Sequence, residues 1–307
     1  MVRGDRAGRK NRLFVGITSW NSETFLGHCI DAVKRTTDPA DTRIVVLDNE
    51  SVDGSRQIAE SRNVEVVNLR SNQPQALNYL LNISQSEFTL LIHSDVILLS
   101  DEWPGLCASY LEGNVAMISP EDIGCGPYTR PWGKGMPESS FMLFRTSLVK
   151  AARRWFRRQR FKIRWPYRAV DFYGEHITYN LPGMLKEKGF TWKMMSVHTS
   201  VKEPSPIYTP GFQPKYWEES WGLYRYGLGN FYSLDGKITH YHNWFDRTVT
   251  ESLDVGEESQ ATFPKEGGLP LAYVKTYTDR FLSDLQSGKL VIPDVGAAET
   301  ARLSGVN

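Results

Sequence analysis

Two polar segments that each follow a short apolar run carry the residue types needed to bind a nucleotide and a cation. Asp48 comes directly after the apolar run at positions 45–47, and Asp53 follows in the same polar loop. Ligands of open parallel sheets bind beyond the carboxyl ends of the strands, so Asp48 is placed to accept a hydrogen bond from a base or a ribose. Asp-Asn and Asp-Gly pairs are also ordinary turn chemistry, and the alternative is that this loop is only a turn.

The second segment is His93-Ser94-Asp95, a polar triplet set inside apolar sequence. An unpaired buried carboxylate is costly, so Asp95 needs a divalent cation or a hydrogen-bond donor beside it. Side chains alternate along an extended chain, which places His93 and Asp95 on the same side, where both could reach one metal ion. The alternative is a core histidine at position 93 and an Asp95 that only caps the next turn.

Elements that bring strand ends together are needed to position these segments, and the first half of the chain has their pattern. Short apolar runs alternate with helical patterns, as expected for an α/β protein with parallel strands joined by crossover helices. The predicted strands are Leu13–Thr18, Arg43–Leu47, Val64–Leu69, Phe88–Ile92, Val115–Ser119 and Phe141–Phe144. The predicted helices are Ser22–Lys34 with Ser22 as its cap, Gln75–Ile83, a segment from Ser147, and Tyr179–Lys188.

The composition is that of a globular protein without a strong overall charge. The 307 residues include 36 Lys and Arg against 35 Asp and Glu, for a net charge of +1, and the mean hydropathy is -0.40. This balance excludes binding of nucleic acid or membrane through overall electrostatics. Neither a membrane span of roughly 18 apolar residues nor a secretory segment is found, so we expect the cytoplasm. There the three cysteines, Cys29, Cys107 and Cys125, should be buried thiols rather than disulfides or a zinc site.

Together these segments resemble the nucleotide-sugar half of family 2 glycosyltransferases, which have the GT-A fold. The resemblance covers residues 13–100, through Gly16–Glu23, Val46–Ser55, Asn72 and Ala76–Asn78, and continues more weakly to about 200. It implies a mixed sheet flanked by helices with an aromatic-rich C-terminal extension. It also implies inverting transfer of a sugar from a nucleotide-sugar, with a UDP-sugar as the favoured donor, to a hydroxyl. The residues implied for donor binding are Thr18, Ser19, Trp20, Asp48, Ser51, Asp53, Asn78 and Ser94.

The resemblance further implies a metal site, although the motif departs from the family pattern. The family usually has Asp-x-Asp or Asn-x-Asp where this chain has His93-Ser94-Asp95, so only the second carboxylate is kept. Mn²⁺ or Mg²⁺ at Asp95 would neutralise the negative charge that builds on the diphosphate leaving group. His93 either ligates the cation or orients a water. His198 lies where many family members present a third ligand, and the alternative is a surface loop histidine.

The segment Asp171–Ile177 resembles the family's Gly-Glu-Asp type segment at the start of a helix, where the catalytic base is placed. Glu175 is kept, and His176 stands where Asp or Glu is usual. An imidazole, or a carboxylate of raised pKa, can accept a proton near neutral pH, so both remain candidates for the base. The alternative is a helix capped by Glu175 with an exposed His176.

Other features lie outside that resemblance. His240 and His242 have the i, i+2 spacing of a strand face and could form a separate metal site or a polar surface pair. The run Arg153–Arg168 holds eight basic residues interleaved with aromatics. It suits an anionic polymer or a membrane surface, or else a solvated helix whose aromatics pack inward. Aromatics that could stack on a sugar or simply pack are Trp217, Trp221, Tyr224, Tyr226, Phe231, Tyr232, Tyr241, Trp244 and Phe245.

These patterns predict a flexible N-terminus (1–12), a nucleotide-sugar-binding part (13–120), an acceptor-binding and catalytic part (121–205) and a C-terminal extension (206–307). The expected partners are a nucleotide-sugar and a hydroxyl acceptor, which can be a glycan, a lipid or a nucleic acid. Arg153–Arg168 adds an anionic polymer or the inner face of a membrane, and an oligomer is left open. Two other classes fit the same residues: a nucleotide-sugar-binding module without turnover, and a nucleotidyltransferase, which releases diphosphate instead of a nucleoside diphosphate.

Overall fold

The computed structural model describes residues 11–122, 136–152, 156, 159–164, 171–199, 226, 229–243, 271–290, 292 and 295. The strands are β1 (Leu13–Ser19), β2 (Thr42–Asp48), β3 (Glu65–Asn68), β4 (Phe88–His93), β5 (Val96–Leu98), β6 (Val115–Asp122), β7 (Met136–Pro137), β8 (Phe141–Arg145), β9 (Gln159–Arg164), β10 (Asp171–His176), β11 (Thr191–Thr199), β12 (Gly229–Leu234) and β13 (Lys237–Asn243). The helices are α1 (Leu26–Thr36), α2 (Ser55–Ser61), α3 (Gln73–Ile83), α4 (Trp103–Ala108), α5 (Thr146–Ala152), α6 (Leu181–Glu187) and α8 (Leu271–Gln286).

One mixed sheet runs through the molecule, in the strand order β3-β2-β1-β4-β8-β6-β11-β12-β13-β5, with β7 paired to β6. β1 pairs in parallel with β2 and β4, and β2 pairs in parallel with β3. The carboxyl ends of these four strands therefore lie at one edge. β8 runs antiparallel to both β4 and β6, and β12 and β13 continue the sheet in antiparallel pairing.

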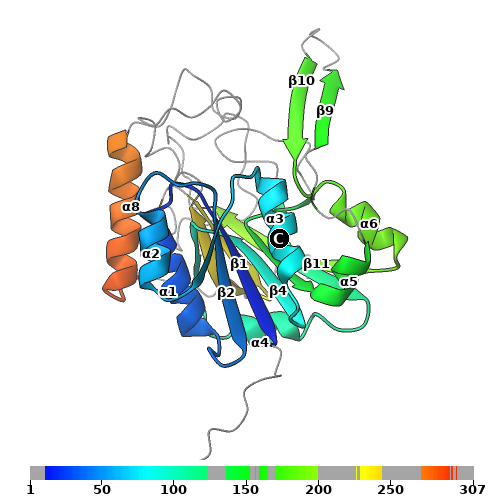
Figure 1. Cartoon of the computed structure of the whole chain (residues 1–307), viewed down its shortest axis with the longest axis horizontal. Coiled ribbons are helices and arrows are strands. Elements are labelled where there is room, and N and C mark those ends of the chain that lie inside the picture. The colour runs from blue at the N-terminus through cyan, green and yellow to red at the C-terminus, as the bar shows by residue number, and fades with distance from the viewer. Residues whose placement is uncertain are drawn as a thin grey trace, which may run out of the picture.

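Helices cover both faces of the sheet, with α1, α2 and α8 on one side and α3, α5 and α6 on the other (Figure 1). The core is divided into two clusters, one on each face, because successive side chains of a strand point to opposite faces. Val15 and Ile17 pack in the cluster that contains residues of α1, and Phe14 packs in the cluster that contains residues of α3. The apolar positions predicted to share one face of each helix are fully or almost fully buried: Phe25, Leu26, Cys29, Ile30 and Val33 at α1, and Ala76, Leu77, Leu80 and Leu81 in α3. The predicted fold class is confirmed.

The predicted strands all occur, and the helices need small corrections. α1 begins at Leu26 rather than Ser22. Ser22 does not cap the helix, because its hydroxyl donates to the Trp20 carbonyl and accepts from the Ser94 hydroxyl. The predicted burial of Cys29 and Cys107 is confirmed, and Cys125 lies outside the described residues.

β9 and β10 form an antiparallel hairpin separate from the main sheet, and Figure 1 shows it projecting away from the sheet. Asp171–His176, expected at the start of a helix, is a strand, because its backbone pairs residue by residue with β9. Positions 159–164 of the basic run are likewise a strand, so a solvated helix is wrong there. Phe156 is buried, and the rest of that run lies outside the described residues.

The C-terminal part of the chain supplies β12 and β13 to the main sheet. Tyr226, Phe231, Tyr232 and Tyr241 are at most 1% exposed, so they pack in the core rather than being available to a sugar. The ring of Phe281 in α8 stacks on Tyr241 with centroids 4.0 Å apart. Trp217, Trp221, Tyr224, Trp244 and Phe245 lie outside the described residues.

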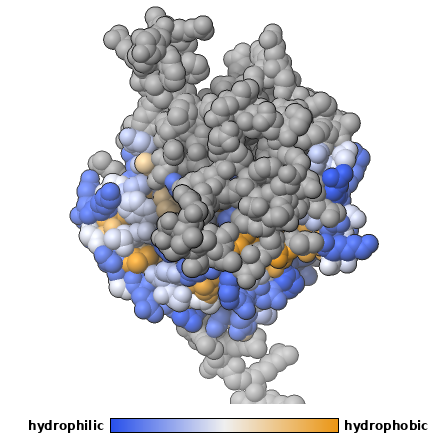
Figure 2. Space-filling view, turned by 180° about the vertical axis from the view of Figure 1, so that it is seen from behind, coloured by the Kyte–Doolittle hydropathy of each residue, from blue (hydrophilic) through white to orange (hydrophobic). Residues whose placement is uncertain are grey.

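On the face seen in Figure 2, which is the back of the view in Figure 1, hydrophobic residues of the described part lie between hydrophilic ones. Among the described helices, none has both the length and the apolar character needed to cross a bilayer.

Candidate functional site

The carboxyl ends of β1, β2 and β4 bring the two predicted polar segments to the same edge of the sheet. Ser19 at the end of β1 pairs with Asp48, and Thr18 pairs with His93 on the other side of β1. Because neighbouring strands are about 4.8 Å apart, Asp48 and His93 are separated by about 10 Å across β1. The Asp48 loop and the His93 triplet therefore flank one strand end.

The loops after β1 and β2 are tied together by hydrogen bonds centred on Asp48. Its carboxylate accepts from the Ser51 hydroxyl at 2.5 Å and from the Ser51 backbone N–H at 3.1 Å. The Ser51 hydroxyl oxygen accepts from the Asn21 N–H, and the Asn21 side chain accepts from the Val52 N–H, both at 2.9 Å. Asp48 thus shapes a turn, as one alternative predicts, while each carboxylate oxygen keeps lone-pair capacity for a ligand.

Asp53 makes a second link between these loops. Its carboxylate accepts from the Glu23 N–H at 3.1 Å and from the Ser55 N–H at 3.0 Å at the start of α2. Of the donor-binding residues predicted at the end of β1 and just after it, Thr18 and Trp20 are partly buried. Ser19 is 3% exposed, and its hydroxyl has no hydrogen-bond partner among the described residues. That hydroxyl is a buried donor and acceptor at the strand end.

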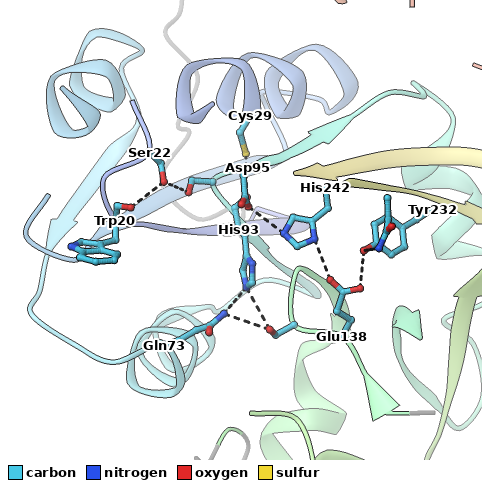
Figure 3. Close-up of polar contacts among 12 residues, drawn as sticks. Trp20, Ser22, Cys29, Gln73, His93, Asp95, Glu138, Tyr232 and His242 are labelled. Atoms are coloured by element: carbon cyan, nitrogen blue, oxygen red, sulfur yellow. Dashed lines mark hydrogen bonds and ion pairs between the residues drawn. The ribbon is translucent and has the colours of Figure 1, made fainter. Parts of the chain in front are cut away.

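Three side chains offer one candidate cation site at the same edge: His93, Asp95 and His242. One potential ligand atom of each lies within 4.8 Å of the other two. His93 ends β4, Asp95 lies in the turn before β5, and β13 pairs with β5 so that His242 stands opposite Val96. The Asn243 N–H also donates to the Asp95 carbonyl at 3.1 Å. The register of β13 against β5 therefore places His242 next to Asp95. Figure 3 shows the two side chains side by side.

His242 lies between two carboxylates. Its Nε2 is 3.4 Å from Asp95 Oδ1, and its Nδ1 is 3.1 Å from Glu138 Oε1. Burial disfavours the charged imidazolium, but the attraction and hydrogen bonds of Asp95 and Glu138 outweigh it and raise the pKa of His242 to about 9. Without a cation the imidazole is therefore positively charged near neutral pH and neutralises part of this acidic pair.

His93 is held by groups at the start of α3 and in the segment before β8. Its Nε2 is 2.6 Å from the side-chain amide nitrogen of Gln73, at the start of α3, and 3.5 Å from the Ser139 hydroxyl. Its backbone N–H donates to the Ser140 carbonyl at 3.0 Å. The rings of His93 and His242 meet edge to face with centroids 5.5 Å apart. Helix α3 and the segment before β8 thus fix this imidazole beside the other two groups.

Several predicted site residues lie elsewhere. His198 is on β11, where its Nε2 is 2.7 Å from the Ser233 hydroxyl, and it is not a member of the three-residue group. Among the described residues, the third member of the group with His93 and Asp95 is His242, and not His198 as predicted. Asn78 exchanges two hydrogen bonds with the Phe156 backbone, at 2.9 and 3.0 Å. Ser94 is buried, and its hydroxyl donates to Ser22.

The histidine pair on β13 corrects both interpretations made from the sequence. In the part of the chain that the structure describes, His240 is not part of the cation group that contains His242. The pair is not on the surface either, because both residues are buried. The His240 ring is stacked between Phe141 and Tyr232, each with centroids 4.5 Å away. Burial, and then the charge of His242, hold the pKa of His240 well below its ordinary value, so this imidazole is neutral.

Glu175 and His176 are adjacent positions of β10, and the side chains of that strand lie outside the described residues. Glu138 was missed by sequence reasoning, since it stands in a Gly- and Pro-rich stretch without periodicity. His242 had a signal in its i, i+2 spacing, but only the pairing of β13 with β5 connects it to Asp95.

Comparisons with known structures give distant likenesses. The 1-349 segment of TarS from S. aureus is 20% identical with a TM-score of 0.38, over 48% of this chain and 50% of that one. Glucosyl-3-phosphoglycerate synthase from Mycobacterium tuberculosis, in complex with Mn²⁺, UDP and glucosyl-3-phosphoglycerate, is 19% identical with a TM-score of 0.37, over 47% of this chain and 59% of that one. The match therefore spans about half the length of these structures. No curated protein matches the chain.

The family comparison covers more of the molecule. The model for glycosyl transferase family 2 matches residues 14–178, which is more than half of the 307 residues. The matched range contains β1 to β4, both loops that flank the end of β1, and the His93-Ser94-Asp95 triplet. The chain therefore belongs to glycosyl transferase family 2.

Proposed function

We propose that this enzyme transfers a sugar from a UDP-sugar to a hydroxyl acceptor with inversion, and that it uses Mn²⁺ in preference to Mg²⁺. The observation that carries the proposal is the convergence of His93, Asp95 and His242 beside the loops that follow β1 and β2. Those loops supply the base and ribose side of the donor site, and the three-residue group supplies the diphosphate side.

The donor atoms of this group fit a divalent transition-metal ion. Two imidazoles and one carboxylate suit Mn²⁺ better than Mg²⁺, which takes oxygen ligands in an octahedron. Asp95 and His242 are 8% exposed, so their own charges are poorly screened by water. When bound, a cation here supplies positive charge next to the diphosphate leaving group.

The protein's own residues have separate tasks in this proposal. Asp48 and the Ser19 hydroxyl hold the base or the ribose, and Asp53 keeps their two loops together through Glu23 and Ser55. In a single displacement, the acceptor oxygen bonds to the anomeric carbon while the bond from that carbon to the diphosphate oxygen breaks. Glu175 or His176 takes the acceptor proton. Holding both substrates in line contributes much of the rate enhancement.

A product assay tests the proposal directly. The full chain is incubated with a panel of UDP-sugars and hydroxyl acceptors, with Mn²⁺ or with EDTA, and released UDP is measured. We expect UDP release with Mn²⁺ and its loss with EDTA. Diphosphate release from UTP would instead indicate a nucleotidyltransferase. A thermal-shift panel of nucleoside diphosphates with and without Mn²⁺ identifies the base, because ligands of the folded state raise its melting temperature.

The two candidate bases are separated by alanine variants. Of Glu175→Ala and His176→Ala, the variant that removes the actual base should lower turnover by about 100-fold or more, since general base catalysis contributes that much. The other variant should keep most of its turnover. UDP binding, measured by calorimetry with Mn²⁺ present, should stay unchanged in both variants. Unchanged turnover in both would remove the assignment and favour another base.

A further inference from the structure

The imidazole of His242 has a carboxylate at each ring nitrogen, and only one of the two belongs to the candidate cation group. Asp95 faces Nε2, on the side of His93. Glu138 meets Nδ1, on the opposite side of the ring, at 3.1 Å. Figure 3 shows His242 between these two side chains. Glu138 is therefore in contact with a candidate ligand without being a member of that group.

Glu138 is itself fixed in place. Its Oε2 accepts from the Tyr232 hydroxyl at 2.8 Å, and its backbone N–H donates to the Pro120 carbonyl at 2.9 Å. The Tyr232 ring is stacked on His240, with centroids 4.5 Å apart and planes at 11°. Glu138 is 8% exposed and Tyr232 is fully buried. A carboxylate held on both sides in this way has little freedom to leave the imidazole.

A hydrogen bond at one ring nitrogen decides what the other can do. A neutral imidazole carries one N–H, and an N–H on Nδ1, which faces the Glu138 carboxylate at 3.1 Å, leaves the lone pair on Nε2. A carboxylate at Nδ1 also fixes the plane of the ring and makes Nε2 a stronger ligand, and loss of such partners typically lowers metal affinity by about 10- to 100-fold. Glu138 therefore contributes to setting both the tautomer and the ring orientation of His242.

We propose that Glu138 is a positioning residue that directs Nε2 of His242 to the cation, and that the Tyr232 hydroxyl holds Glu138 in that task. This inference rests on the proposed cation site at His93, Asp95 and His242. Glu138 acts through His242 and not as a ligand, because it is not a member of the three-residue group, and its oxygens face the imidazole and the tyrosine hydroxyl.

The test is the affinity of the full chain for Mn²⁺ alone, measured by the electron paramagnetic resonance of free Mn²⁺ during titration. Glu138→Ala should weaken Mn²⁺ binding by about 10- to 100-fold. Glu138→Gln keeps an oxygen that can accept from Nδ1, so it should recover most of that loss. Tyr232→Phe keeps the stacked ring and removes only the hydroxyl, so it should weaken binding by less than Glu138→Ala.

Matched controls lie at a second buried tyrosine–carboxylate pair among the described residues. The Tyr226 hydroxyl donates to Asp284 at 2.8 Å, and Asp284 is 8% exposed, as Glu138 is. Asp284→Ala and Tyr226→Phe should therefore leave Mn²⁺ affinity unchanged at a similar structural cost. Circular dichroism checks that every variant is folded, and Glu138→Gln provides a second reading if Glu138→Ala does not fold.

Each outcome bears on a different statement. If the wild-type chain binds no Mn²⁺, the proposed cation site fails and the role of Glu138 fails with it. If the wild type binds Mn²⁺ and Glu138→Ala binds it equally well, only the role of Glu138 is overturned. The same follows if Asp284→Ala weakens binding as much as Glu138→Ala does. Selective loss in Glu138→Ala with recovery in Glu138→Gln supports positioning.

Discussion

His93 stands where family 2 members usually carry an aspartate or an asparagine, and this exchange alters the ligand chemistry of the site. With His93 and His242, the candidate ligand set consists of two imidazoles and one carboxylate, that of Asp95. Because Mg²⁺ takes oxygen ligands, we expect His93→Asp to raise the ratio of activity with Mg²⁺ to activity with Mn²⁺. A rise of about tenfold corresponds to about 1.4 kcal/mol in the barrier. UDP release with each metal measures this ratio.

His198→Asn is the matched control for that exchange. His198 is a buried histidine that contacts Ser233 and lies outside the candidate cation group. Its replacement should leave the metal preference as in the wild type. An unchanged ratio in His93→Asp would contradict His93 as a ligand and would support the alternative that it orients a water.

The charge on His242 makes a second prediction at the residue scale, for protein freed of cations with EDTA. Its pKa is raised from 6.5 to about 9, so its ion pairs stabilise the fold fully below pH 6.5, and this contribution is lost as the pH rises toward 9. Between these values the folding equilibrium constant should fall by at most about tenfold per pH unit. Thermal unfolding from pH 6 to 9.5 measures it. His242→Gln should show a flatter profile, and equal slopes would contradict the ion pairs.

At the scale of elements, the first four strands and the helices α1 and α3 could be predicted because each is encoded locally. Successive side chains of the apolar run before Asp48 pack in the two core clusters in turn, as expected for a strand. Leu77, Leu80 and Leu81 repeat at helical spacing. The part played by Glu138 and His242 could not be predicted in this way. Those residues reach Asp95 only through the pairing of β13 with β5 and through the segment before β8, which are contacts between distant parts of the chain.

The contact between α3 and β1 gives a prediction at the same scale. A Cβ on Gly16 would lie 2.9 Å from Leu91 Cδ2 and 3.1 Å from Leu80 Cβ, so α3 approaches β1 too closely for a larger residue. Gly16→Ala should lower the free energy of unfolding by about 1–3 kcal/mol through overpacking. Urea denaturation followed by circular dichroism measures this.

Gly105 offers the matched control for the glycine prediction. It lies in α4 with open space where a Cβ would be, so Gly105→Ala should stabilise the protein by about 0.5–1 kcal/mol. Equal effects of the two substitutions would mean that the α3–β1 contact adjusts freely.

At the scale of the whole molecule, the candidate site draws on both halves of the chain. His93 and Asp95 come from the part matched by the family model, and His242 comes from beyond it. Tyr232 lies beyond it too, on the strand that pairs with β13. The C-terminal part, predicted as an extension, therefore completes the sheet and supplies one of the three groups that face the cation position.

The basic run at Arg153–Arg168 carries the last prediction, which concerns binding of the whole molecule to an anionic surface. Net charge is only +1, so attraction to an anionic surface has to come from a local concentration of cations such as this run. Each basic residue near an anionic bilayer contributes about 1 kcal/mol. Changing Arg153, Arg154, Arg157 and Arg158 to Gln should therefore weaken binding to phosphatidylserine vesicles by about 100-fold or more, as measured by cosedimentation.

The control for that prediction removes the same charge from scattered positions. Arg12, Arg43, Arg56 and Lys275 lie in partly or fully exposed surface ion pairs, whose loss costs little stability. Their replacement by Gln should leave vesicle binding largely intact. Binding of the wild type should also weaken as salt rises, because the Debye length shrinks from about 10 Å at 0.1 M to about 3 Å at 1 M. Equal losses in the two variants would attribute binding to net charge, and salt-independent binding would assign the run to packing.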